Sequence, residues 1–93
     1  MRLYEWDAAK ARTNLEKHGV SFTEAQTVLE DSLARYREDA SHSFDEPRFI
    51  VIGRSVNDRV LVVIHSEQGE TVRIISARPA NRREREAYEQ EPV

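Results

Sequence analysis

The chain has 93 residues, which suits a single domain spanning residues 1–93 with a small core. It has no cysteine, which excludes disulfides, thiolate metal sites and thiol nucleophiles. The net charge is −3, but the stretch from Arg73 to Arg85 holds five arginines and only one acid, so a local basic surface on an acidic chain is compatible with RNA binding at one place.

A short strand and a helix are predicted at the N-terminal end. Residues 2–6 alternate apolar and polar side chains, the pattern of a strand. Asp7 is a helix N-cap, because its carboxylate can accept the free N–H groups of the first turn. The helix should end near His18, because Gly19 can take the left-handed conformation that closes helices.

A second helix should begin immediately and continue to about Asp31. Ser21 and Glu24 form a capping box, in which the hydroxyl accepts the Glu24 N–H and the carboxylate returns to the Ser21 N–H. The two helices therefore meet at a tight turn. Neither carries the basic residues expected of a DNA-recognition helix, which argues against a DNA-binding repressor subunit.

Four strand-like segments follow, with turn signals at Asn57-Asp58 and Gln68-Gly69. They are Leu33–Glu38, Arg48–Gly53, Arg59–Ile64 and Thr71–Ala77. A second capping box, Asn81 with Glu84, begins a last helix and accounts for Glu84 by its position alone. The order β-α-α-β-β-β-β-α predicts an α+β fold with an antiparallel meander and the helices packed on one face.

The polar loop 39–47 contains possible metal ligands without a recognised ligand spacing, so neither a metal nor a cofactor is expected. These ligands are Asp39, His42, Asp45 and Glu46. The N-terminal residues are too polar for a secretory signal, and the longest apolar run, 60–64, is too short to span a membrane. A cytoplasmic protein is therefore expected.

Motifs along most of the chain resemble the BrnT family of toxins. They include Lys17-His18-Gly19-Val20-Ser21-Phe22 and Arg73-Ile74-Ile75-Ser76-Ala77-Arg78, with Trp6-Asp7 before them and Glu84-Arg85 and Tyr88 after them. The resemblance implies a RelE-like ribonuclease that a BrnA-like antitoxin neutralises. It also implies that DNA is contacted only through the toxin–antitoxin complex, which represses its own promoter.

The simplest chemistry for such a chain is metal-independent RNA cleavage by the substrate's own 2′-hydroxyl. This reaction needs a general base, a general acid and positive charge on the transition state. Two arginines can supply the charge. Arg78 lies between the last predicted strand and the last helix, and Arg73 lies within that strand. His65 is the candidate base or acid, because histidine titrates near neutral pH.

The relative placement of His65 and Arg73 remains open. A two-residue turn at Gln68-Gly69 would put them on opposite faces of the sheet, and a bulge or a one-residue change in the loop would reverse this. Further RNA contacts are expected from Lys10, Lys17, Arg82 and Arg83. The alternative function is a non-catalytic module, or co-repressor subunit, that acts through a protein complex.

Overall fold

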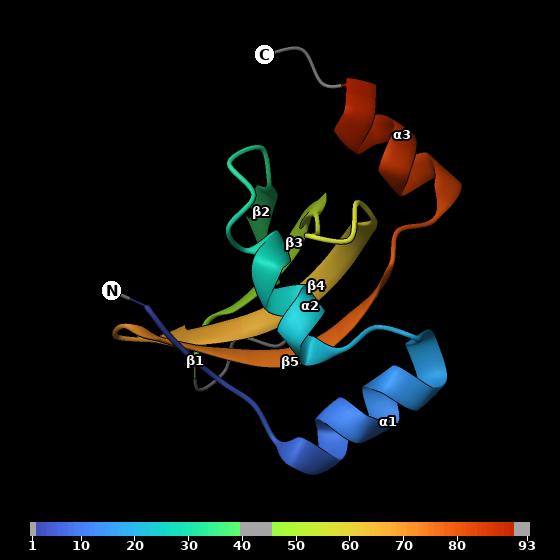
Figure 1. The fold of residues 1–93 in the computed structure, drawn as a ribbon. Helices are drawn as coiled ribbons and strands as arrows, with labels where there is room; N and C mark the ends of the chain where they lie inside the picture. Colours follow the sequence, from blue (N-terminus) through green and yellow to red (C-terminus); the bar gives the residue numbers. More distant parts are fainter. Residues whose placement is uncertain (1, 40–45, 91–93) are drawn as a thin grey trace.

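The computed structural model describes residues 2–39 and 46–90 (Figure 1). Its elements are β1 (Leu3–Glu5), α1 (Ala8–His18), α2 (Phe22–Val28), β2 (Arg35–Glu38), β3 (Arg48–Arg54), β4 (Val60–Gln68), β5 (Thr71–Pro79) and α3 (Arg82–Gln90). A five-stranded sheet with three helices confirms the predicted α+β class. In the part of the chain described, no helix is long and apolar enough to cross a membrane.

The sheet has the strand order β1-β5-β4-β3-β2. Strands β2 to β5 are antiparallel to their neighbours. β1 lies against the other side of β5 and runs parallel to it, with Tyr4 opposite Val72. The meander therefore comprises four strands, and the sheet as a whole is mixed.

The ends of α1 follow the sequence signals. The Asp7 carboxylate accepts the Lys10 N–H at 2.9 Å, as expected of an N-cap. Gly19 has φ 70°, and its N–H donates to the Leu15 carbonyl at 2.9 Å. The predicted end of this helix is confirmed.

Helix α2 ends at Val28, three residues before the predicted end at Asp31. The Ser21 hydroxyl accepts the Glu24 N–H at 3.0 Å, as predicted. The returning half of that capping box is wrong, because the Glu24 carboxylate turns away to Ser55 and Arg59. The helix stops early where the Asp31 carboxylate accepts the backbone N–H groups of Leu33 and Arg54.

The main core lies between α1 and α2 and one face of the sheet. It includes Val20, Phe22, Ala25, Val28, Val51, Leu61, Val63, Val72, Ile74 and Ala77. A second cluster on the opposite face joins Val60, Val62 and Ala80 with the half-buried Ile50, Ile52 and Tyr88. Tyr88 belongs to α3, so the prediction that all helices pack on one face is wrong. Figure 1 shows α2 crossing the sheet and α3 set apart from α1 and α2.

The hairpin between β4 and β5 differs from the predicted one. Gln68 pairs with Thr71, so the two-residue turn is Gly69-Glu70 and β4 extends well beyond the predicted Ile64. Gly69 has φ 62°, which suits a residue without a Cβ. A bulge follows: Ile64 pairs with Ser76 and His65 with Ile74, which leaves Ile75 as an extra residue in β5.

Candidate functional site

Arginines gather on the sheet face that α1 and α2 leave uncovered. Directly paired residues of adjacent strands point to the same face, so the register defines three rows across it. The rows are Arg35-Ile52-Val62-Arg78, Arg37-Ile50-Ile64-Ser76, and Arg48-Ser66-Arg73-Glu5. We call this surface, with Arg35, Arg37, Arg48, Arg73 and Arg78, the arginine face.

The bulge in β5 is what places both predicted catalytic arginines on this face. Without an extra residue, positions 73 and 78 of a regular strand would point to opposite faces. Ile75 shifts the alternation by one, so that Arg73 pairs with Ser66 and Arg78 with Val62. At about 3.3 Å per residue the backbones of the two arginines are roughly 15 Å apart along the strand.

Arg78 is held by Glu84. Its two terminal nitrogens donate to the two carboxylate oxygens at 2.8 and 2.9 Å. The Arg78 guanidinium, helped by the Asn81 N–H, lowers the pKa of Glu84 to about 2. Glu84 also completes the predicted capping box, with both bonds to Asn81 at 2.8 Å. Glu84 therefore has two roles, whereas the sequence had assigned it only the cap.

Arg73 is exposed and forms an ion pair with Glu5, its neighbour in the register. It borders a hollow of about 240 Å³ with Ser66, Thr71 and Glu46. Arg73 is therefore available to a ligand at the end of the arginine face away from Arg78.

His65 lies on the other face of the sheet. It is fully buried among core residues and stacks on Phe49 at 5.4 Å between ring centroids. Burial lowers its pKa, and neither ring nitrogen has a hydrogen-bond partner among the residues that the structure describes. The structure thus separates His65 from Arg73 and Arg78, and the sequence-based grouping of these three residues in one site is wrong.

The four predicted RNA-binding residues fall in two places. Lys10 and Lys17 line a hollow of about 340 Å³ between α1 and β5, which also includes Ser76 of the arginine face. Arg82 and Arg83 are exposed on the first turn of α3, where Arg82 contacts Glu86 at 3.0 Å. The two lysines therefore lie on α1 beside β5, and the two arginines lie on α3, which follows β5.

The sequence missed three arginines of this face, Arg35, Arg37 and Arg48. The first two alternate along β2, a segment whose strand pattern was weak, and Arg48 begins β3. Their alternation with Tyr36 and Phe49 was the signal in the sequence that could have placed these arginines on one face of the sheet. Arg35 donates to the carbonyls of Ala87 and Tyr88, which ties β2 to α3.

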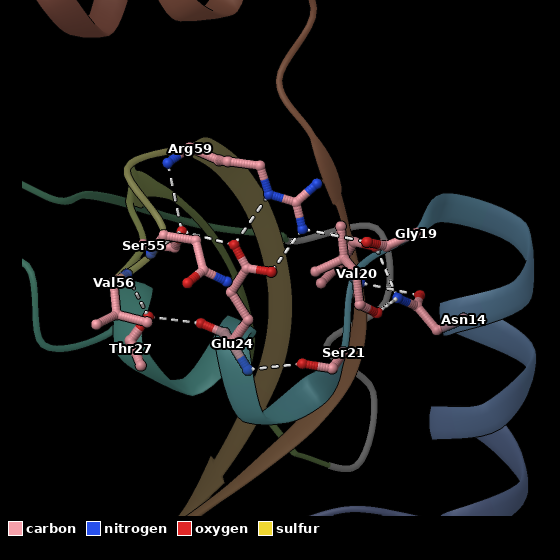
Figure 2. A network of polar contacts seen from close by, with 11 residues as sticks. Asn14, Gly19, Val20, Ser21, Glu24, Thr27, Ser55, Val56 and Arg59 are labelled. Atoms are coloured by element: carbon pink, nitrogen blue, oxygen red, sulfur yellow. Dashed lines mark hydrogen bonds and ion pairs between the residues drawn. The ribbon is translucent and has the colours of Figure 1, made fainter.

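A buried polar network supports the N-terminal half of the fold (Figure 2). The Glu24 carboxylate, only 6% exposed, accepts bonds from Ser55 at 2.7 Å and from Arg59 Nε at 3.0 Å. The Arg59 hydrogen bond lowers the pKa of Glu24. Arg59 also donates to the Gly19 carbonyl at 3.1 Å, so the network joins the α1–α2 turn to the β3–β4 hairpin.

The Asn14 side chain forms hydrogen bonds with the backbone of β5 at the part of its edge that β1 does not cover. Its amide donates to the Ala77 carbonyl at 2.8 Å, and its oxygen accepts the Ala77 N–H at 3.1 Å. A second amide hydrogen reaches the Val20 carbonyl at 3.0 Å. The buried side chain thus takes the place of a neighbouring strand beyond the end of β1.

Among the described residues, no group of three or more histidine or acidic side chains is arranged to hold a metal ion. His42 and Asp45 of the polar loop lie outside the described residues.

Comparisons with known proteins agree on one family. A family model described as "Ribonuclease toxin, BrnT, of type II toxin-antitoxin system" matches residues 6–84. Among solved structures, the ribonuclease toxin BrnT of Brucella abortus is similar, with a TM-score of 0.67 and 25% sequence identity. The similarity covers 88% of this chain and 100% of that chain. No curated protein sequence matches the chain.

Proposed function

The chain belongs to the BrnT family of ribonuclease toxins of type II toxin–antitoxin systems, and on this premise we propose that it is an endoribonuclease that works without a metal ion. In the proposed reaction, the 2′-oxygen of one nucleotide attacks the adjacent phosphorus. A bond from the 2′-oxygen to phosphorus forms as the 2′-hydroxyl loses its proton, and the bond to the 5′-oxygen breaks as that oxygen takes up a proton. The products are a 2′,3′-cyclic phosphate and a 5′-hydroxyl.

The observation that carries the proposal is the arginine face, in which Arg78 forms a bidentate ion pair with Glu84. Arg78 is half-buried, lies next to the last residue of β5, and is held by a carboxylate that also caps the start of α3. A preorganised guanidinium of this kind stabilises negative charge that develops on a phosphoryl group. We assign Arg78 to the reacting phosphate and Arg73 to a neighbouring one.

The proposal gives neither His65 nor Glu84 the role of general base. A base must reach the 2′-hydroxyl, and His65 is buried on the core face. Glu84, with a pKa of about 2, is too weak a base at neutral pH. Its role is to orient Arg78.

The remaining basic residues extend the RNA path on both sides of β5. Arg82 and Arg83 lie beyond Arg78 at the start of α3, and the hollow with Lys10 and Lys17 adjoins the arginine face at Ser76. We propose that these residues hold phosphates outside the cleaved position. We also propose that the fold is RelE-like, as the resemblance to the BrnT toxins implies.

The experiment that tests this function is RNA cleavage by the purified chain in EDTA, followed by analysis of the new 3′ ends. Cleavage that continues in EDTA and leaves 2′,3′-cyclic phosphates supports the mechanism. Activity that disappears with the chelator and returns with magnesium contradicts it.

We further propose a BrnA-like antitoxin as the partner, because membership of a type II family implies an antitoxin. The arginine face is the surface that such an inhibitor has to cover. DNA binding then belongs to the complex, through the antitoxin, and we propose that the chain acts on RNA in the cytoplasm.

A further inference from the structure

A groove of about 220 Å³ lies between α3 and the arginine face. Its floor is apolar and consists of Ile50, Ile52 and Val62 from the middle of the sheet. Ala87 and Tyr88 of α3 form one wall, and Arg37 lies at the rim. An apolar floor with guanidinium groups at its edge is suited to a flat, partly polar ring attached to an anion.

The wall formed by α3 is held in place from several directions. The Tyr88 hydroxyl donates to Asp31, and the Arg54 guanidinium lies 5.9 Å from the Tyr88 ring centroid. Arg35 donates to the carbonyls of Ala87 and Tyr88 at 3.1 and 3.3 Å. The groove is therefore preformed.

The groove adjoins the proposed position of the reacting phosphate. Val62, in the floor, is the register partner of Arg78, and Glu84, which holds Arg78, also lines the groove. A nucleotide whose phosphate contacts Arg78 therefore has this groove within reach of its base.

We propose that the groove binds one nucleobase of the RNA, next to the phosphate held by Arg78; this inference rests on the proposed ribonuclease function. Proteins that recognise single-stranded RNA place splayed-out bases against aromatic side chains and guanidinium planes. The groove offers both, in Tyr88 and Arg37, over an aliphatic floor. Arg73, about 15 Å along the strand, contacts the backbone beyond this base.

The test compares an Ala87→Leu variant, whose larger side chain fills the groove, with Ala8→Leu as its matched control. Both alanines are exposed helix residues, and Ala8 lies on α1, outside the groove. The probes are short 2′-O-methyl RNAs of randomised sequence, which cannot be cleaved, and abasic chains of the same length. Stacking of one base should make the wild-type protein bind the RNA about five- to 100-fold more tightly than the abasic chain.

Ala87→Leu should lose this base-dependent gain and keep the affinity for the abasic chain, which also shows that the variant is folded. Ala8→Leu should keep the gain. If Ala87→Leu retains the gain, or alters only the oligomeric state of the chain, the base site is overturned. If the wild-type protein binds neither probe, it is the proposed ribonuclease function that fails.

Discussion

Arg78 and Glu84 form a bidentate ion pair, in which each terminal nitrogen of the guanidinium donates to one oxygen of the carboxylate. Arg78 is the last residue but one of β5, and Glu84 lies in the first turn of α3. The pair therefore spans the connection between sheet and helix, and it holds the Arg78 side chain in one orientation before any ligand arrives.

Replacing Arg78 by alanine should remove cleavage and leave the fold intact. The loss of one charge donor at the transition state costs on the order of 10²–10³ in rate. The measurements are RNA cleavage by the purified variant and growth on its expression. Arg12→Ala, which removes an exposed arginine of α1, should behave as the wild type. An Arg78→Ala variant that cleaves at the wild-type rate would remove Arg78 from the proposed site.

Glu84→Gln should lower stability at neutral pH by about 1–2 kcal/mol, less than the full pKa difference implies because Arg78 is partly exposed. The folded-state pKa of about 2 lies below the ordinary 4.5, so the carboxylate stabilises the fold above pH 4.5 and loses this effect as the pH falls towards 2. Urea unfolding of both proteins should show the difference narrowing between pH 5 and pH 3. A difference independent of pH in this range would contradict the ionic contribution.

Removal of Arg59 should be among the most destabilising surface substitutions. Arg59→Ala leaves the Glu24 carboxylate without its charged partner, and because the Arg59 side chain is 40% exposed we expect a cost of about 1–3 kcal/mol, below that of breaking a fully buried pair. Thermal or urea unfolding measures the effect. Arg82→Ala, which breaks the exposed pair with Glu86, serves as the control and should cost less than about 0.5 kcal/mol. Equal effects of the two substitutions would show that the Glu24 network is dispensable.

Asn14→Asp should destabilise the edge of β5 by about 2–3 kcal/mol, although it changes hardly any volume. The carboxylate still accepts the Ala77 N–H, but it can no longer donate to the carbonyls of Ala77 and Val20. Hydrogen exchange at the Ala77 amide and at its neighbours in β5 should accelerate. Unchanged exchange there would mean that the side chain does not support the edge.

Binding of the antitoxin should raise the melting temperature and suppress RNA binding together. A partner that binds only the folded chain adds stability by mass action, and an inhibitor of the arginine face hides the groups that meet phosphate. The test is a thermal melt and an RNA-binding assay, each with and without the product of the neighbouring gene. If the complex binds RNA as well as the free chain does, direct occlusion is wrong.

Local signals in the sequence predicted the start of each helix and the end of α1, because these caps depend on a few adjacent residues, but they placed the end of α2 three residues too late. Asp7, Gly19 and the Asn81–Glu84 box occur as expected. Glu24 differs, because its carboxylate had a local donor and a distant one, and the charged Arg59 outweighs the backbone N–H of Ser21. Sequence spacing alone could not weigh these two.

The faces of the strands depend on register, which the sequence left open. The turn lies one residue later than predicted, and the bulge at Ile75 has no signature in composition. The bulge decides that Arg73 and Arg78 share one surface, whereas a two-residue turn at either position puts His65 and Arg73 on opposite faces. The separation of His65 from Arg78 could therefore emerge only from the pairing of β4 with β5.

The extra residue in β5 is a place where the strand can change length without turning the arginines away from each other. Ile75 lies outside the regular pairing, so its deletion would leave Ile74 opposite His65 and Ser76 opposite Ile64. Arg73 and Arg78 would then be four residues apart in a regular strand and would still share a face. An insertion between the two arginines that leaves the bulge in place would instead turn one of them towards the apolar core. Relatives of this fold can thus lose the bulge residue and keep activity, whereas a single inserted residue between positions 73 and 78 should abolish it.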